Sequence, residues 1–338
     1  MSAETFWVRA WYTKKTWLLL LAPIAWLFSG LSSLRRHYLQ SVHQGTPFSA
    51  PVVVIGNISV GGSGKTPLII ALVRELNEKG YSVGVVSRGY GGKAIRYPLI
   101  VSKNTPVYES GDEPLLIVKS CGCPVVVDPN RENAVRTLLE RFSCDLVLSD
   151  DGLQHYRMHR DVEVAVVDAS RGLGNKLTLP AGPLREPLKR LQEVDFVVHN
   201  GGEGISVDSG NVKNTCFVKL EPVGLHKFGA EELISVAQWV DSMSVHAVAG
   251  IGHPERFAST LKEMGFEPDL HAKNDHEALS IDDLRFKDQR PIIITEKDAV
   301  KYNDAVPDNL WVLEVRMLLS DQLVDNVLAS AGLPVTNL

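Results

Sequence analysis

The sequence predicts an α/β protein: a parallel sheet of the P-loop NTPase type, a second, smaller α/β lobe, and an N-terminal membrane helix. Three observations predict it: an uncharged apolar stretch near the N-terminus, a glycine-rich loop between an apolar run and a helical pattern, and short apolar runs alternating with helical stretches. The 338 residues suffice for two domains of about 100–200 residues each. We expect the helical segment, the P-loop core, a linker or hairpin and the smaller lobe to occupy 1–45, 46–200, 201–210 and 211–338.

Composition excludes several classes of protein. The net charge of −5 argues against non-specific nucleic-acid binding as the main activity, so we expect no nucleic-acid partner. The four cysteines form no CxxC pair and no zinc-spaced set with histidine, and they suggest no disulfide framework. We therefore expect reduced cysteines in a cytosolic compartment, and no pattern indicates an obligate protein partner.

The N-terminal segment is the first element. Thr16–Leu34 holds 19 residues without a charge, with Lys14 and Lys15 before it and Arg35 and Arg36 after it. A span of about 20 apolar residues crosses a bilayer, so this one is borderline. A cleaved signal peptide, a buried core helix and a membrane-inserted or membrane-lying helix are the alternatives. We favour the membrane helix, on a cytoplasmic leaflet, because export would separate the nucleotide-binding loop that follows in the sequence from the cytosolic nucleotide pool.

A phosphate-binding loop follows. Val52–Ile55 is typical of a buried strand, and a helical pattern begins at Lys65. Glycines between them let backbone N–H groups turn toward phosphate oxygens at a helix N-terminus. Lys65 would reach the β- and γ-phosphates and Thr66 would hold Mg²⁺. The expected ATP-binding residues are Ser59, Val60, Gly61, Gly62, Ser63, Gly64, Lys65 and Thr66.

The class of nucleotide-binding protein depends on smaller signals. Ser59 replaces the first glycine of the strict P-loop pattern, although the Lys-Thr pair and the strand–helix context remain. The nearest match to a guanine-reading NKxD motif, 175–178, lacks the acid, so a GTPase is disfavoured. A membrane-associated ATPase switch of the MinD/ParA kind is the rival interpretation, but Val60 stands where those proteins carry their signature lysine.

Further strands and a pair of acids complete the first domain. A helix is predicted over 131–142, and Asp150 and Asp151 end one of the apolar runs, where a P-loop sheet places an acid near Mg²⁺. The predicted strands are 83–86, 124–127, 145–148, 164–167 and 196–198.

Four loop motifs could handle an acceptor group. They are SRGYGG at 87–92, SGDEP at 110–114, DDGLQH at 150–155 and PAGPLREP at 180–187. Each of them alone could equally be a loop with solvated charges.

Together these motifs resemble those of the tetraacyldisaccharide 4'-kinase family, the lipid A pathway kinases of Gram-negative bacteria. The resemblance covers nearly the whole chain and includes GNISVGGSGKTP, the four loop motifs, and later AGIGHPERF, NDH and TEKDAVK. It implies transfer of the γ-phosphoryl group of ATP to the 4'-hydroxyl of a tetraacyl glucosamine disaccharide 1-phosphate, giving lipid IV A. It also implies ATP and Mg²⁺ as cofactors, a lipid substrate, a membrane surface as partner, and the cytoplasmic face of the bacterial inner membrane as location.

The resemblance also implies residue roles. Asp112 would act as base on the acceptor hydroxyl, paired with His276 of the NDH motif, although His253 and His271 lie close by in sequence. The expected catalytic residues are Asp112, His276, Asp151 and Lys65, and the expected metal ligands are Thr66, Asp150 and Glu113. The expected substrate contacts are Asn57, Arg88, Gln154, His155, Arg185 and Glu186. Which of Asp112, Asp150 and Asp151 takes the proton stays open at this stage.

A second α/β pattern follows the glycine-rich stretch at 201–204. Its fragment AGIG at 249–252 lacks the third glycine of a dinucleotide fingerprint, so no NAD site is expected. The predicted strands are 245–249, 291–295 and 310–315, and the predicted helices are 254–264 and 321–330. We expect this lobe to close over the first, excluding water and bringing His276 to the site.

Overall fold

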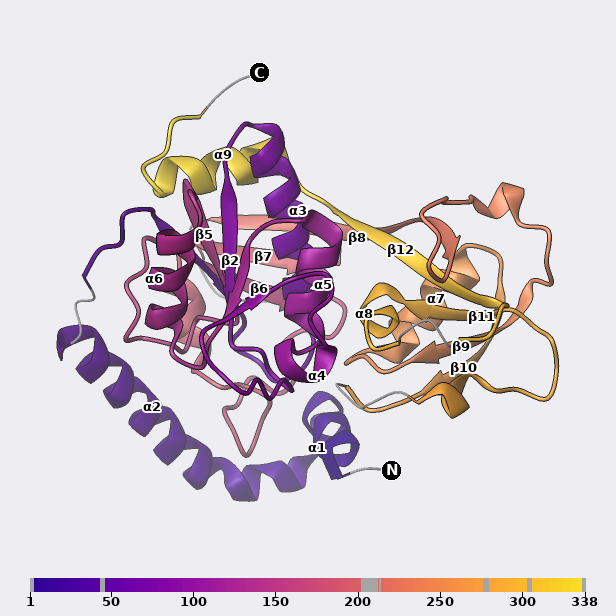
Figure 1. The fold of residues 1–338 in the computed structure, drawn as a ribbon. Coiled ribbons are helices and arrows are strands. Elements are labelled where there is room, and N and C mark those ends of the chain that lie inside the picture. The colour runs from indigo at the N-terminus through magenta and orange to yellow at the C-terminus, as the bar shows by residue number, and fades with distance from the viewer. Residues whose placement is uncertain are drawn as a thin grey trace.

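The computed structural model describes residues 3–42, 46–201, 212, 214–275, 280–302 and 306–335, with side chains from Trp7 onward. Two lobes lie side by side in Figure 1, with the helices of the N-terminal segment running beneath the first. One sheet of twelve strands passes through both lobes, in the order β10-β9-β11-β12-β8-β7-β6-β1-β5-β2-β4-β3. The structure therefore contains the predicted sheet and the predicted second α/β lobe.

The sheet of the first lobe is parallel from β8 to β4, and only its edge strand β3 is antiparallel. Its inner strands are fully buried runs of β-branched and other apolar residues, as a sheet covered on both faces requires. The strands are β1 Val52–Gly56, β2 Val83–Ser87, β3 Leu99–Val101, β4 Val125–Val127, β5 Leu146–Asp150, β6 Val162–Asp168, β7 Phe196–Asn200 and β8 Thr215–Lys227.

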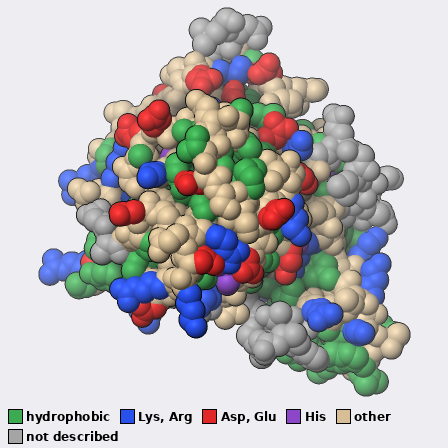
Figure 2. Space-filling view, turned by 90° about the vertical axis from the view of Figure 1, so that its right-hand side faces the viewer, with side chains coloured by type: hydrophobic (Ala, Val, Ile, Leu, Met, Phe, Trp, Pro, Cys, Tyr) green, Lys and Arg blue, Asp and Glu red, His purple; other side chains and the backbone are tan. Residues whose placement is uncertain are grey.

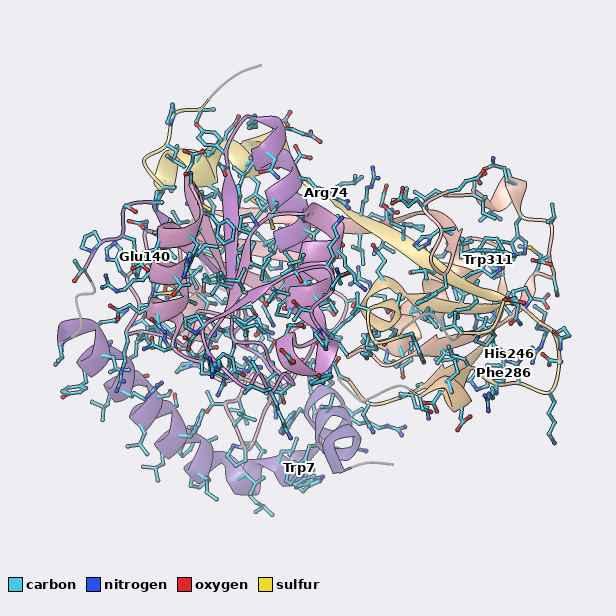
Figure 3. The ribbon with its side chains drawn as sticks, in the orientation of Figure 1. Trp7, Arg74, Glu140, His246, Phe286 and Trp311 are labelled. Atoms are coloured by element: carbon cyan, nitrogen blue, oxygen red, sulfur yellow. The ribbon has the colours of Figure 1, made fainter. Side chains whose placement is uncertain are left out.

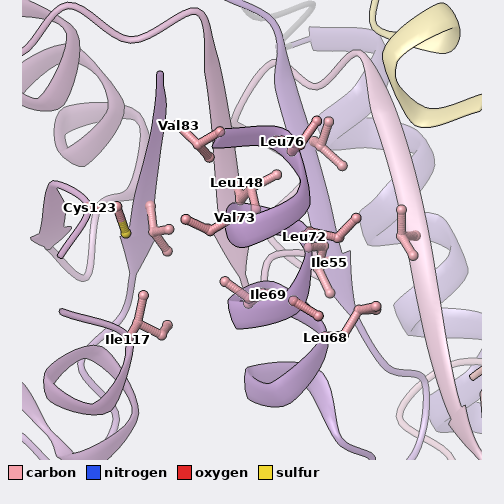
Figure 4. Packing of buried hydrophobic residues seen from close by; sticks show 14 of the residues in the cluster. Ile55, Leu68, Ile69, Leu72, Val73, Leu76, Val83, Ile117, Cys123 and Leu148 are labelled. Atoms are coloured by element: carbon pink, nitrogen blue, oxygen red, sulfur yellow. The ribbon is translucent and has the colours of Figure 1, made fainter. Parts of the chain in front are cut away.

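Helices cover both faces of this sheet. Along β1, Val53 and Ile55 face the cluster that includes α3 and α5, whereas Val52 and Val54 face the cluster that includes α6. Figure 4 shows how apolar side chains of α3 pack on the strands. The helices are α3 Lys65–Glu78, α4 Val107–Ser110, α5 Asp112–Cys121, α6 Arg131–Arg141 and η2 Leu188–Gln192.

The second lobe repeats the design on a smaller scale. Strands β10, β9, β11 and β12 are parallel, and the helices of this lobe pack on them. Its elements are η3 Val236–Gln238, β9 Ser244–Ala249, α7 Pro254–Glu263, β10 Glu267–Ala272, η4 Ile281–Leu284, β11 Ile292–Thr295, α8 Glu296–Ala299 and β12 Leu310–Leu318.

Two long strands join the lobes. The first residues of β8 pair with β7 of the first lobe, and the remainder pairs antiparallel with β12 of the second. After β12 the chain returns to the first lobe, where α9 (Asp321–Ser330) packs Leu323 and Val327 into the cluster that holds α3 (Figure 1). The predicted domain boundaries stay a prediction. The prediction assigned the segment of α9 to the smaller lobe, whereas α9 packs on the first lobe. Most of the predicted linker, 202–210, falls outside the described residues.

The N-terminal segment forms α1 (Ala3–Tyr12), η1 (Thr16–Leu21) and α2 (Ala22–Val42). Among the described residues, Thr16–Val42 is the one helical stretch long and apolar enough to cross a membrane, judged by length and composition. Only 17% of its most apolar window is buried in the protein, which disfavours the buried-core alternative. Its exposed apolar side chains include Leu19, Leu20, Ile24, Trp26, Leu27, Leu31 and Leu34.

Candidate active site

The P-loop turns sharply between β1 and α3. Gly61 has φ +102° and Gly64, which precedes α3, has φ +89°, values that L side chains rarely adopt. A Cβ on Gly64 would lie 2.1 Å from Nδ2 of Asn200, the last residue of β7. The same Nδ2 donates a hydrogen bond to the carbonyl of Ser63 at 3.1 Å. Glycine is therefore required at position 64 for both its conformation and its close contact.

A hydrogen-bond network supports the loop from below. Asn57 Nδ2 donates to the Gly61 carbonyl at 3.2 Å, and Gln154 Nε2 donates to the Asn57 carbonyl at 3.0 Å and to Glu186 Oε2 at 2.9 Å. The hydroxyl of Tyr156 also donates to Glu186. Three expected substrate contacts, Asn57, Gln154 and Glu186, thus hold the P-loop in shape, and their contact with substrate stays a prediction.

Lys65 and Arg185 converge on Asp151. Nζ of Lys65 lies 3.4 Å from Oδ1 of Asp151, and Nη1 of Arg185 lies 3.2 Å from Oδ2. Burial raises the pKa of Asp151, but the two cations outweigh burial and the net pKa is lowered. Asp151 is therefore ionised, and it holds the P-loop lysine at the carboxyl edge of the sheet.

Asp150 is set deeper, with 1% of its surface exposed. Ser87 Oγ donates to its Oδ2 at 3.2 Å, whereas its buried Oδ1 has no hydrogen-bond partner among the described residues. Burial, and then the charge of Glu113, raise the pKa of Asp150 to about 7. Beneath it, buried Arg131 donates to the Asp150 carbonyl at 3.1 Å.

These groups fit the Mg²⁺ that a P-loop kinase uses. An orphaned, buried carboxylate oxygen beside a second acid is a group that a divalent cation would satisfy. Thr66 at the start of α3 is buried, as the predicted hydroxyl ligand should be. Thr66, Asp150 and Glu113 are thus suited to hold the ion, and their assignment as ligands stays a prediction.

The acids of the GDEP motif meet a lysine of the second lobe. Nζ of Lys297 lies 3.7 Å from Asp112 Oδ2, 3.2 Å from Glu113 Oε1 and 3.2 Å from Asp275 Oδ1. Burial lowers the pKa of Lys297, but the three carboxylates outweigh burial and raise it, so the ammonium is kept. Asp112 itself begins α5 and is 5% exposed. The ammonium of Lys297 thus links both lobes at Asp112, the residue expected from sequence to act as the base.

The second lobe also covers the P-loop. A Cβ on Gly252 would lie 3.0 Å from the backbone nitrogen of Gly62 and 3.1 Å from Asp275 Oδ2. Arg256 of α7 donates to Asn200 Oδ1 at 3.2 Å, which ties the second lobe to the residue that holds Ser63. The loop before α7 therefore lies directly over the glycines.

The predicted histidines and Arg88 are not part of the groups described above. His276 lies outside the described residues, so its pairing with Asp112 stays a prediction. His253 comes just before α7, next to Gly252, whereas His271 lies on β10 beside His246. Arg88 follows β2 and is exposed.

His155 lies among arginines. Burial, followed by the charge of Arg131 and that of its other arginine neighbours, lowers its pKa to about 4. The ring is therefore neutral at pH 7. The other arginines that act on it are Arg160, Arg157 and Arg35, the last from the N-terminal helix.

Several residues of the site carry no expected role from sequence. Asn200 follows the predicted strand 196–198 by two residues and ends the observed β7, so its place at the same sheet edge as Asp150 could have been inferred. Lys297 lies in the TEKD sequence, but no local signal shows that it reaches the GDEP acids. Arg256 and Asp275 likewise depend on how the lobes meet.

Comparisons of the sequence and of the structure with known proteins all identify the same family. A family model described as tetraacyldisaccharide-1-P 4'-kinase matches residues 17–332. The tetraacyldisaccharide 4'-kinase of Psychrobacter cryohalolentis is 42% identical over 97% of this chain and 96% of its own. That of Aeromonas hydrophila is 44% identical over 96% and 95%. The crystal structure of LpxK from Aquifex aeolicus in complex with ATP is similar with a TM-score of 0.75 and 26% identity, covering 93% of this chain and 99% of that one.

Proposed function

The chain belongs to the tetraacyldisaccharide-1-P 4'-kinase family, and from this premise we infer that it is an ATP-dependent kinase of lipid A biosynthesis. It transfers the γ-phosphoryl group of ATP to the 4'-hydroxyl of a tetraacyl disaccharide 1-phosphate. Family membership supports this activity and not the ATPase switch of the MinD/ParA kind. Within the structure, one observation supports the assignment most directly: the GDEP acids lie beside Lys297, next to a P-loop that the second lobe covers.

Asp112 is the proposed base. Its carboxylate is buried and lies near one ammonium, so it can accept the proton of an acceptor hydroxyl. Lys65, positioned by Asp151, would contact the transferred phosphoryl group. Asp151 is already engaged by two cations, which makes it a positioning group rather than the proton acceptor. Mg²⁺, when bound by Thr66, Asp150 and Glu113, would neutralise charge on the phosphates.

The head group of the acceptor would lie on the side of His155. Neutral His155 would donate a hydrogen bond to the 1-phosphate, and Arg157 and Arg35 would add positive charge near it. Arg35 brings part of this charge from α2, the helix with the exposed apolar face. A lipid held in the bilayer beside α2 would therefore present its phosphate to these groups.

The apolar part of the substrate has a matching environment. A cavity of about 350 Å³ is lined by Trp7, Val8, Trp11, Val60 and Pro180, so an apolar surface continues from the N-terminal helices to the P-loop. We place these helices on the cytoplasmic face of the inner membrane, where ATP is available. The acyl chains would remain in the bilayer during transfer.

The test is transfer of labelled γ-phosphate from ATP to a tetraacyl disaccharide 1-phosphate in detergent. We expect efficient transfer by the native protein and a fall of kcat by about 10²-fold or more in Asp112→Asn, because the base is lost while the shape is kept. Glu132→Gln is the matched control: Glu132 also lies in the first turn of a helix, but its ion pair with Arg136 is exposed.

Each part of the proposal can fail separately. Full activity in Asp112→Asn would move the base elsewhere and leave the kinase intact. Absence of transfer by the native protein, with ATP hydrolysed only in the presence of membranes, would contradict the kinase itself.

A further inference from the structure

A cluster of histidines and acids lies in the second lobe, on strands β9 and β10. His246 pairs with Asp269 in the parallel register, and His271 follows Asp269 by two positions, on the same face of β10. One ligand atom from each of the three side chains lies within 4.8 Å of the other two. Figure 3 labels His246 and Phe286 in the second lobe, and Figure 2, which views the molecule from the side of that lobe, shows acidic and basic side chains close together on its surface.

The tautomer of His246 follows from its neighbours. Its Nε2 lies 2.8 Å from Oδ1 of Asp288, a carboxylate oxygen that accepts the hydrogen bond. Its Nδ1 lies 3.4 Å from Nη2 of Arg290, a group that can only donate. In the neutral ring Nε2 therefore carries the proton and Nδ1 presents a lone pair. Stacking on Phe286, with ring centroids 3.7 Å apart, fixes the plane of this buried ring.

The lone pair faces the other two groups. His271 Nε2 lies 3.1 Å from His246 Nδ1, and Asp269 Oδ2 lies 3.9 Å from His246 Nδ1 and 3.7 Å from His271 Nε2. Two imidazole nitrogens on a tetrahedral zinc ion, each about 2.0–2.1 Å from it, are about 3.3 Å apart. The two rings already have nearly this separation, and a carboxylate bound to the distal nitrogen of one ring is the usual outer support of a metal-binding histidine.

We propose that His246 Nδ1, His271 Nε2 and the Asp269 carboxylate bind one Zn²⁺ or a similar transition-metal ion, with Asp288 orienting His246. Two imidazoles and one carboxylate suit such an ion, whereas Mg²⁺ prefers oxygen ligands alone. The site is thus distinct from the one proposed for catalysis. The ion would join the edge strand β10 to β9.

Without the ion the same groups form a hydrogen-bonded cluster. His271 Nε2 then donates to His246 Nδ1, and Arg290 Nη2 lies 3.6 Å from Asp269 Oδ2. Binding requires His271 to carry its proton on Nδ1 instead and Arg290 to withdraw. A neighbouring cavity of about 550 Å³, lined in part by Asp269 and Arg290, gives the guanidinium room. Arg290 is therefore a competitor of the ion.

The test is titration of untagged, full-length, metal-free protein in detergent with Zn²⁺ against a chromophoric chelator. We expect one equivalent to bind, with affinity at least about 10-fold lower in His271→Gln and Asp269→Asn and lower by about 10-fold in Asp288→Asn. Arg290→Gln should bind more tightly, because the competing cation is removed. His226→Gln, which changes a histidine on β8, is the matched control and should bind like the native protein.

Several results would overturn the proposal. These are no binding by the native protein at 1:1 stoichiometry, unchanged affinity in His271→Gln, or equal loss in His226→Gln. Displacement of Zn²⁺ by millimolar Mg²⁺, or weaker binding by Arg290→Gln, would do the same. Thermal unfolding of each metal-free variant shows whether a loss of binding reflects the site or a loss of fold. Because the Asp269 side chain is 55% exposed, Asp269→Asn should fold normally and still tests the site if His271→Gln is unstable.

Discussion

Lys297 is the residue on which the two lobes converge. Its ammonium is the shared cation of Asp112, Glu113 and Asp275, and its side chain is only 17% exposed. Removing one partner of a buried ionic cluster leaves the others uncompensated, which is far more costly than losing a surface pair. Lys297 should therefore affect both the position of Asp112 and the contact between the lobes.

We predict that Lys297→Met lowers kcat/KM for phosphoryl transfer by about 10-fold or more, because three carboxylates lose their cation. Lys297→Arg should recover part of the activity, since it keeps the charge while changing the geometry. The assay is the same transfer of labelled phosphate. Lys219→Met, at an ammonium that is 64% exposed, is the control, and native activity in Lys297→Met would contradict the role.

The raised pKa of Glu296, the residue before Lys297, leads us to predict that the stability of the protein depends on pH. Burial raises its pKa from 4.5 to about 7, although its Oε2 accepts a hydrogen bond from the Val315 N–H at 3.1 Å. A carboxyl with a raised pKa in the folded state favours folding when protonated, so its contribution is lost as the pH rises from about 4.5 through 7. A pKa that rises from 4.5 to about 7 on folding corresponds to a contribution of up to about 3 kcal/mol to the free energy of unfolding.

Glu296→Gln keeps the acceptor and removes the charge, so it should raise the free energy of unfolding by up to about 3 kcal/mol at pH 8 and by less than about 1 kcal/mol at pH 5. Urea unfolding at the two pH values measures the difference. Glu221→Gln, at an exposed position, should show no such trend. An equal effect of Glu296→Gln at both pH values would contradict the raised pKa.

At the scale of elements, the segment 178–187 connects the N-terminal helices to the P-loop. The indole N–H of Trp11 donates to the Pro180 carbonyl at 3.0 Å, and the Thr178 hydroxyl donates to the carbonyl of Ala25 in α2 at 2.8 Å. On its other side, the segment accepts from the Val60 N–H through Pro183 at 2.8 Å. The helix that we place at the membrane is thus in contact, through one short loop, with the nucleotide site.

The exposed face of the N-terminal helices gives a prediction. Leu20 and Leu27 are 82% and 64% exposed, so the double substitution of both by Glu should leave thermal unfolding unchanged in detergent. Binding to vesicles of phosphatidylethanolamine and phosphatidylglycerol should fall by at least about 10-fold, because two leucines no longer enter the bilayer. Co-sedimentation measures it, with Gln40→Glu on the same helix as control. Undiminished binding would contradict the placement of this face in the membrane.

At the scale of the whole molecule, the lobes meet over the nucleotide site, and two long strands, β8 and β12, run between them. The Gly252 region lies against Gly62, so nucleotide phosphates and the acceptor need the lobes to separate before they bind. Strands β8 and β12 carry a register shift at Glu314/Val315, a place where the pair can bend. The closure of the second lobe stays a prediction, and this connection is where we expect the bend.

We predict that the shape of the protein changes when a non-hydrolysable ATP analogue, Mg²⁺ and the lipid acceptor are added together. Small-angle neutron scattering in contrast-matched detergent measures the radius of gyration with and without these ligands. Lys65→Ala, which lacks the P-loop lysine, should show a smaller change. Identical scattering of the native protein in both conditions would rule out the lobe motion.

The sequence by itself determined the elements whose information is local. The buried strand, glycines and Lys-Thr pair of the P-loop form within about 15 consecutive residues, and short apolar runs with caps and turns predicted most other strands and helices close to their observed bounds. Strands β3, β8 and β10 escaped prediction: β3 has only three residues, and β8 and β10 mix polar residues and proline with apolar ones. Edge and connecting strands tolerate such residues.

Only the tertiary structure decided which distant side chains meet. Lys297 contacts the GDEP acids although it lies 184 residues after Glu113. No periodicity or motif encodes this contact. The same holds for the return of α9 to the first lobe and for the pairing that brings His246, Asp269 and His271 together. Local patterns reflect how a segment buries its own apolar side chains, whereas these contacts depend on how whole lobes and strands are arranged in space.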